Sequence, residues 1–331
     1  MKNTYRLFTF ILFASLFLFR TAEAQERTSL TKKEKNIIIE KALKLLNDEY
    51  VFPDVALKIE KHIKVKLAEG IFNKITDYNE FAEKLTKEMR FISKDKHMVC
   101  WCGTGSQSFQ KSADSIKSRI PEIKLKNEKR FSFVRAGVIE NNIGVLDFNF
   151  LPLLRESKES TDKVMKIVSG ASALIIDLRK NPGGDGELVK YICSYLLDKP
   201  THINSIYSRH SNTTEDYVTL EKVDGKKMTN VPVFVLTSSF TFSAAEEFAY
   251  DIQTQKRGIL VGEVTGGGAN PTGGFPLDYG FWISVPQGRA INPITKTNWE
   301  GTGVKPDIMV DAAKAFDIAL SKTKNIITNK R

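Results

Sequence analysis

The sequence predicts an α/β protein in which a small helical subdomain precedes the α/β domain. Two observations support this prediction. Between about residues 31 and 92 apolar residues recur at helical spacing, whereas after Phe131 short apolar runs alternate with helical segments. Buried strands that alternate with helices are typical of an α/β core. The 331 residues give room for both units, and 41% hydrophobic and 27% charged residues are the proportions of a globular chain.

Residues 1–24 have the pattern of a secretory signal peptide. Lys2 and Arg6 precede an apolar stretch from Leu7 to Phe19, and Ala22-Glu23-Ala24 ends the segment with small residues at the cleavage positions. The apolar stretch is short for a membrane span, which needs roughly 20 residues. We therefore expect an exported protein, periplasmic or extracellular, that is cleaved near Ala24 and has no stable membrane anchor.

Three helices are expected in an N-terminal subdomain at 25–102. The first carries Ile38 and Ala42 on one face, and the turn from Val51 to Asp54 separates it from the second. The segment Asp77-Tyr78-Asn79-Glu80 has the pattern of a capping box and predicts the start of the third helix. The charged stretch 103–130 has few apolar residues and is expected to be a linker.

The α/β domain is expected at 131–325. The predicted strands cover 131–136, 143–150, 173–178, 232–237 and 258–262, with Asn141-Asn142 as the turn between the first two. The predicted helices cover about 160–168, 186–197, 244–255 and 312–321.

Composition excludes several classes of function. Three cysteines are too few for a disulfide scaffold or a four-cysteine zinc site, and a Cys100–Cys102 bridge would close a very small, strained loop, so we expect free or buried thiols. Removal of residues 1–24 lowers the formal charge from +10 to +8, but lysines are scattered without a stripe, so no nucleic-acid partner is expected. No metal and no cofactor are predicted. Three of the four histidines are expected at the surface: His62, His202 and His210.

Two segments contain candidate catalytic groups. From Asp177 to Gly186 a predicted strand leads through Gly183-Gly184 into a helix, and such turns expose backbone N–H groups that suit an oxyanion, although an ordinary strand–helix loop has the same pattern. In the second segment, 237–248, a helix begins at Ser243. Ser243-x-x-Glu246 is a capping-box pattern, and most such serines only cap a helix. The functional alternative is a nucleophilic Ser243 hydroxyl beside the N–H of Ala244.

Together these segments resemble the tail-specific (C-terminal-processing) serine peptidases. The motifs D-L-R-x-N-x-G-G, T-S-S-x-T-x-S-A-A-E-E-F-A and V-G-E-x-T-x-G-G-A-N-P occur here in that family's order, at 177–184, 237–249 and 261–271. The resemblance extends from about Thr31 to Val310. It implies a crotonase/ClpP-like α/β domain behind a helical N-terminal subdomain, and Ser243 as the nucleophile.

The resemblance also distinguishes between two catalytic arrangements. The serine–lysine branch has its base 25 residues after the nucleophile, and here that residue is Gly268. The other branch resembles the tricorn core peptidase and the interphotoreceptor retinoid-binding protein modules, whose peptidases use a histidine and a late glutamate. Its S-x-D-x-H motif matches 93–97 and its E-x-x-G-V-x-P-D motif matches 300–307. The resemblance therefore implies His97 as base and Glu300 as its carboxylate. Lys96 stands where tricorn-like enzymes have a linking serine.

The resemblance further implies oxyanion donors and a substrate. The donors would be the Ala244 N–H and the N–H of either Gly183 or Gly184. The expected substrate is a peptide or protein, with extended peptides pairing with a strand edge near Gly183. The interval 103–130 is too short for the PDZ domain of many relatives, since a domain needs about 50 residues or more. The alternative is a non-catalytic hydrophobic-ligand or peptide-binding protein on the same fold. A third class, a nucleic-acid or membrane-surface module, would need a contiguous basic face.

Overall fold

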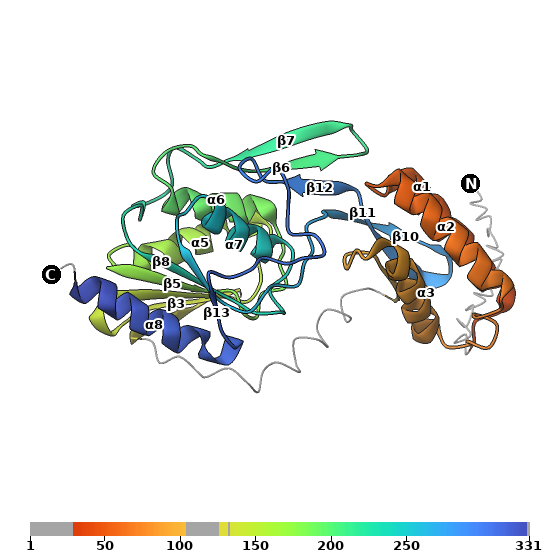
Figure 1. Ribbon diagram of the computed structural model, residues 1–331, viewed down its shortest axis with the longest axis horizontal. Coiled ribbons are helices and arrows are strands. Elements are labelled where there is room, and N and C mark those ends of the chain that lie inside the picture. Colours follow the sequence, from red (N-terminus) through yellow and green to blue (C-terminus); the bar gives the residue numbers. More distant parts are fainter. Residues whose placement is uncertain (1–28, 104–125, 132, 330–331) are drawn as a thin grey trace, which may run out of the picture.

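The structure is a computed structural model, and it describes residues 29–103, 126–131 and 133–329. The predicted signal peptide and most of the predicted linker lie outside these ranges. Figure 1 shows two units side by side, a helical one that contains the first described residues and a larger α/β one that ends with the C-terminal helix. Among the described residues, no helix has the length and apolar character that a membrane span requires.

The helical unit contains the three predicted helices. They are α1 (Lys32–Glu49), α2 (Pro53–Ala68) and α3 (Tyr78–Ser93), followed by the short strand β1 (Val99–Cys102). The Asp77 side chain accepts a hydrogen bond from the Glu80 N–H at 2.8 Å, which confirms the predicted start of α3. Helix α3 ends at Lys94, whose positive φ of 59° turns the chain towards β1.

The core of this unit also uses residues from late in the chain. Strand β1 pairs with β11 (Phe281–Pro286), which in turn pairs with β10 (Thr272–Pro276), and both pairings are antiparallel. Phe281, Ile283 and Val285 are buried against the three helices. The helical unit therefore needs a segment that lies more than a hundred residues downstream, and the sequence analysis did not anticipate this return of the chain. Cys100 and Cys102 are free thiols, as expected, and Cys193 is a free, buried thiol.

The α/β unit is built on a seven-stranded mixed sheet. In spatial order its strands are β13 (Ile308–Met309), β9 (Ile259–Gly262), β8 (Val233–Thr237), β5 (Ala173–Asp177), β4 (Ile143–Phe148), β3 (Val134–Ile139) and β2 (Lys126–Arg130). Pairing is parallel from β13 to β4 and antiparallel from β4 to β2. Strand β2 lies in the range predicted as linker. Strand β3 begins three residues later than predicted and runs up to the turn at Asn141 and Asn142, which both have positive φ.

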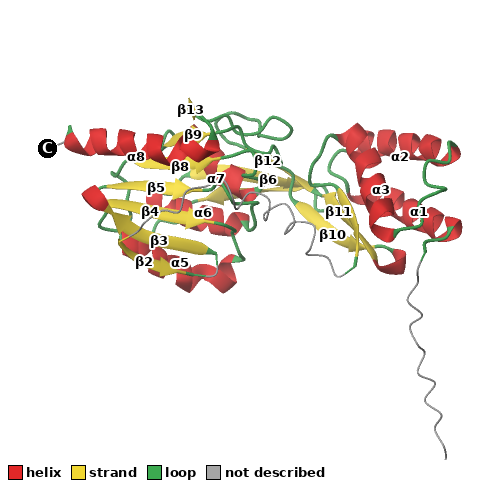
Figure 2. Ribbon diagram, turned by 90° about the horizontal axis from the view of Figure 1, so that it is seen from below, coloured by secondary structure: helices red, strands yellow, loops and turns green. Residues whose placement is uncertain are grey.

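Helices cover both faces of this sheet, as the α/β prediction requires. Helices α5 (Leu154–Val168), α6 (Gly186–Leu196) and α7 (Ala244–Thr254) bury one face, and α8 (Ala312–Thr328) buries the other. Figure 1 shows α8 on the side of the sheet opposite to α5, α6 and α7, and Figure 2 shows it running along the strands. The carboxyl ends of β5 and β8 lead into α6 and α7, so the loops that carry the two predicted motifs meet at one edge of the sheet.

A second small sheet lies beside the junction of the two units. It consists of β12 (Gly288–Ile291), β6 (His202–Ser208) and β7 (Thr213–Val218), with β6 in the middle. Just after β6, the Arg209 guanidinium donates to the backbone carbonyls of Tyr50 and Asn47 in the helical unit. The Val51 N–H donates to the Pro286 carbonyl at 2.9 Å. The Arg209 contacts join this small sheet to the helical unit, and the Val51 contact ties the returning strand β11 to the turn between α1 and α2.

Three of the four histidines, His62, His202 and His210, lie away from the loops that carry the predicted motifs. His202 is partly exposed and bonds to Ser205, and His210 is exposed near Glu49. His62 is only partly exposed: its side chain is 16% exposed, and its Nε2 lies at hydrogen-bond distance, 2.8 Å, from a Glu88 carboxylate oxygen. This partner, Glu88, lies on the neighbouring helix α3, and the charged pattern of the helix that carries His62 does not indicate it.

Candidate active site

Ser243 lies at a sharp turn between β8 and α7. Its φ of 54° and ψ of −127° are uncommon for a residue with a side chain, and such strained positions persist only where the surroundings hold them. Ala244 is the first residue of α7, so its N–H has no acceptor within the helix. The turn therefore presents a half-buried serine at the positive end of a helix, beside an N–H that is free to bind an anion.

Glu246 holds this turn in place. Its carboxylate is fully buried and accepts the Ser243 N–H at 2.9 Å and the Gly268 N–H at 2.8 Å on one oxygen. The other oxygen accepts from the Gly267 N–H and the Thr265 hydroxyl. The capping pattern seen in the sequence is therefore present on the glutamate side, and it also ties the serine turn to the glycine-rich loop 266–268.

The loop after β5 packs directly on the serine turn. A Cβ atom at Gly183 would lie 2.7 Å from the Ser243 Cβ and 3.0 Å from the Ala244 nitrogen, and its φ is +106°. The Gly183 N–H donates to the Asn181 side chain at 2.8 Å and is thus already used. Gly184 has a φ of +140°, and a Cβ there would lie 1.8 Å from the Leu151 carbonyl oxygen. Its own N–H has no acceptor among the described residues.

His97 reaches the serine turn from the helical unit. It lies between α3 and β1, and its ring packs on the ring of Phe242, the residue before Ser243, with centroids 4.5 Å apart. The side chain is 11% exposed. No hydrogen bond joins the His97 ring to the Ser243 hydroxyl among the described residues, and such catalytic bonds are often long before substrate binds.

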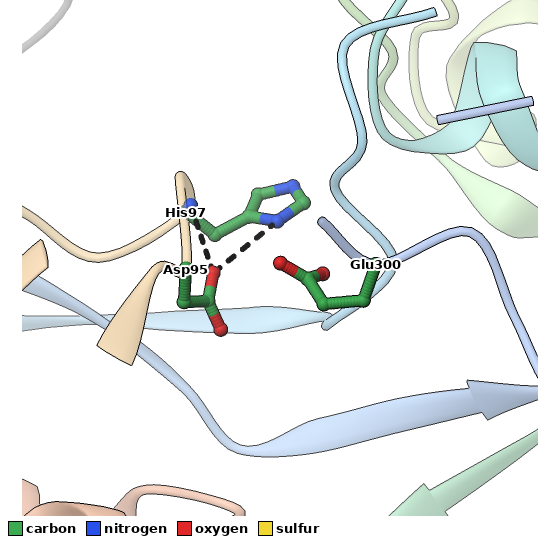
Figure 3. Close-up of side chains that lie close together, drawn as sticks. All are labelled: Asp95, His97 and Glu300. Atoms are coloured by element: carbon green, nitrogen blue, oxygen red, sulfur yellow. Dashed lines mark hydrogen bonds and ion pairs between the residues drawn. The ribbon is translucent and has the colours of Figure 1, made fainter. Parts of the chain in front are cut away.

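Two carboxyl groups lie on the Nδ1 side of the His97 ring. Figure 3 shows Asp95 and Glu300 on that side, with Nε2 on the opposite side of the ring. One donor atom from each of the three side chains lies within 4.8 Å of the others. His97 Nδ1 and Glu300 Oε1 are both buried and have no hydrogen-bond partner among the residues that the structure describes, and leaving such groups unpaired costs about 1–3 kcal/mol each. A small rotation that joined them would therefore be favourable.

Burial controls the protonation of this cluster. Desolvation, with the positive charge of Arg90 as a second cause, lowers the pKa of His97 to about 4. Desolvation raises the pKa of Glu300 to about 8, with the charge of Asp95 as a second cause. The pKa of Asp95 is also raised by burial. His97 is therefore neutral at pH 7, which is the form that a general base needs.

The packing around Gly268 explains why a base at position 268, such as the lysine of the serine–lysine branch, and a base at His97 exclude each other. A Cβ at Gly268 would lie 2.6 Å from the His97 Cε1 and 2.3 Å from the Phe242 Cζ. The His97 and Phe242 rings therefore fill the space that a side chain at this position would need. In this chain the histidine arrangement requires a glycine at 268.

Lys96 does not take the place of the linking serine. Its Nζ donates to the Gly266 carbonyl at 2.5 Å and points to the glycine-rich loop instead of lying between His97 and Glu300. Asp95 is the residue that touches His97, since its Oδ1 accepts the His97 N–H at 3.0 Å. No role for Asp95 was predicted from the sequence, although it lies inside the S-x-D-x-H motif, and Glu246 was predicted only as part of a helix cap.

The fold and the site together define a class of protein. A serine at a strained strand–helix turn, two unused N–H groups beside it, and a buried histidine with carboxyl support are the parts of a nucleophilic hydrolase site. Asp95, His97 and Glu300 also offer three donors to a cation, but their buried, unpaired nitrogen and oxygen are equally the two ends of a histidine–carboxylate hydrogen bond.

Comparison with known families identifies the family. The model of peptidase family S41 matches residues 142–310, more than half of the chain, and the chain belongs to this family. The N-terminal domain of the same family in eukaryotic interphotoreceptor retinoid-binding protein matches residues 22–136. These matches confirm the resemblance drawn from the three motifs and the expected helical subdomain.

Individual relatives agree with this assignment. The chain is 30% identical over 141 residues to a carboxyl-terminal-processing protease of Picosynechococcus, a match that covers 43% of this chain and 32% of the relative. A carboxy-terminal processing protease of Bacillus subtilis is 32% identical over 129 residues, covering 39% and 26%. The chain thus spans about a third of the length of these curated relatives or less.

Solved structures share the fold. A putative peptidase from Parabacteroides merdae superposes with a TM-score of 0.62 at 16% identity, and the match covers 87% of this chain and 96% of that one. The tricorn protease gives a TM-score of 0.54 at 14% identity, covering 89% and 37%.

Proposed function

We propose that this chain is an exported serine peptidase. In the proposed mechanism His97 takes the proton of the Ser243 hydroxyl, and the resulting alkoxide attacks the carbonyl of a peptide bond. The Ala244 and Gly184 N–H groups stabilise the oxyanion, because the Gly183 N–H already binds Asn181. Glu300 supports the imidazole from the Nδ1 side.

The proposal rests mainly on one observation. Packing of the His97 ring on Phe242 brings the histidine of one unit next to the nucleophile turn of the other, with its unpaired Nδ1 turned to the unpaired Glu300 Oε1. An ordinary N-capping serine would not require a neutral, buried histidine beside it. Family membership supports the same function.

The expected substrates are extended peptides selected by the catalytic domain without a PDZ domain. The predicted signal peptide supports a location outside the cytoplasm, and we expect mass spectrometry of the secreted or periplasmic chain to find its N-terminus near residue 25. A chain that keeps residues 1–24 after export would contradict the predicted cleavage.

A serine-reactive fluorophosphonate tests the catalytic proposal. We expect covalent labelling of the wild-type protein at Ser243, no labelling of Ser243→Ala, and cleavage of a peptide library by the wild type alone. Absence of an adduct on folded protein would favour the alternative, a non-catalytic hydrophobic-ligand or peptide-binding protein on the same fold. Cleavage by both proteins would indicate a contaminating peptidase.

A further inference from the structure

Asp95 is the carboxyl group most firmly tied to His97. It is 1% exposed, and its Oδ1 accepts the His97 backbone N–H at 3.0 Å while lying 4.0 Å from the ring Nδ1. The same Asp95 oxygen therefore binds the backbone N–H of His97 and faces the Nδ1 side of its ring, where a carboxylate can orient the imidazole. Figure 3 shows both of these contacts.

The two carboxyl groups of the cluster differ in their hydrogen bonds. Asp95 accepts three: the His97 N–H, the Asn270 amide at 2.8 Å and the Tyr50 hydroxyl at 3.4 Å. Glu300 accepts one, from the Ala269 N–H at 2.6 Å, and its other oxygen has no partner. Donors to a carboxylate favour its ionised form, and two neighbouring buried carboxylates do not both ionise readily.

We infer that Asp95 is the ionised carboxylate that holds and orients the His97 imidazole, while Glu300 carries the proton that the two carboxyl groups share. The inference rests on the proposed function and assigns Asp95 as a positioning residue. Asp95 would thus hold the His97 imidazole in a chain that has Lys96 at the position of the linking serine.

The charges around the cluster are compatible with this assignment. Arg90 of α3 donates to the Met98 carbonyl at 2.8 Å and lies near Asp95 and His97, and Lys96 is the second cation close to Glu300. The remaining titratable neighbours are Tyr50, whose pKa is raised by burial, and Glu246. Burial and the Asp95 charge both raise the pKa of Glu300, in the direction of a protonated group at neutral pH.

The assignment specifies where each proton lies. An ionised Asp95 favours the neutral imidazole with its proton on Nδ1, which leaves the Nε2 lone pair free on the opposite side of the ring. The Ser243 proton moves to Nε2, and the imidazolium that forms is stabilised by Asp95. The proton returns from Nε2 to the leaving amine, and Glu300 stays neutral throughout.

Nitrogen NMR of the His97 ring tests the orientation without requiring activity. The experiment uses Ser243→Ala protein labelled with ¹⁵N histidine, with and without Asp95→Asn. We expect the proton on Nδ1 in the parent and a shift towards the Nε2–H form in Asp95→Asn. Asp54→Asn, an exposed aspartate with 73% side-chain exposure, is the matched control and should leave the His97 signals unchanged. An unchanged His97 tautomer in Asp95→Asn would overturn the inference.

Fluorophosphonate labelling rates separate the two carboxyl groups. We expect Asp95→Asn to slow labelling of Ser243 by about 100-fold or more, and Glu300→Gln by less than about 10-fold, because an amide resembles a neutral carboxyl group. Glu159→Gln, on an 84% exposed side chain, is the control for the glutamate change. A larger loss in Glu300→Gln than in Asp95→Asn would refute the assignment.

Asn270→Ala and the labelling of wild-type protein cover the cases in which Asp95→Asn does not fold or the wild type is inactive. If Asp95→Asn does not fold, Asn270→Ala removes one donor to the Asp95 carboxylate and should shift the His97 tautomer in the same direction; no shift there would also refute the inference. Failure of wild-type protein to label at any pH would remove the peptidase proposal, whereas the NMR result would still decide the role of Asp95.

Discussion

Replacement of Gly268 by alanine should disable the site while leaving the fold intact. The new Cβ would lie 2.3 and 2.4 Å from two ring atoms of Phe242 and 2.6 Å from the His97 Cε1, well inside normal contact distances of about 3.4–4 Å. Both rings would have to move by roughly 1 Å. Overpacking of this kind costs about 1–3 kcal/mol, and a 1 Å misplacement of a catalytic group can reduce the rate by about 100-fold.

The measurement is the second-order rate of fluorophosphonate labelling at Ser243, together with the thermal unfolding midpoint. Gly274→Ala is the matched control, since a Cβ at Gly274 would have no atom within 4 Å. We expect a loss of about 100-fold for Gly268→Ala, with a drop of a few degrees in the midpoint, and near wild-type labelling for Gly274→Ala. Labelling of Gly268→Ala at the wild-type rate would show that the His97 ring does not have to occupy this space.

Three other predictions concern the same fold. Gly184→Ala should lower the urea midpoint strongly or prevent folding, because its Cβ would overlap the Leu151 carbonyl at 1.8 Å; a stability change below about 1 kcal/mol would contradict this. Asp251 is fully buried, and burial raises its pKa and that of Glu247, the latter to about 7. Since both folded pKa values are raised above those of the unfolded chain, the stability that these two groups contribute is full at low pH and is lost as pH rises, for Glu247 through about 7. Asp251→Asn should therefore show a smaller drop in urea midpoint between pH 5 and 8 than wild type, and an equal drop would assign the pH dependence to other groups. The labelling rate should stay level as pH falls to about 5 and halve near pH 4, where His97 becomes protonated; a midpoint near 6.5 would show that the imidazole is not desolvated.

Local sequence patterns determined most of the secondary structure of this chain. The three N-terminal helices, the Asp77 cap and the parallel strands β5, β8 and β9 follow from apolar periodicity and turn chemistry, which act over a few residues. The motifs likewise indicated Ser243, His97 and Glu300, and the comparisons confirmed the family. Their catalytic roles remain predictions.

Only the tertiary structure brought these residues into one cluster and showed what surrounds them. Strands β10 and β11 return to the helical unit, a pairing across a long sequence separation that no local pattern encodes. Packing of the helical unit against the α/β unit also brings Asp95 and His97 next to Glu300. The pKa of a side chain depends on its burial and on the charges nearby. Whether a backbone N–H can bind an oxyanion depends on whether the fold already gives it an acceptor. For this reason the sequence supplied the candidate residues, whereas the fold decided their protonation and their partners.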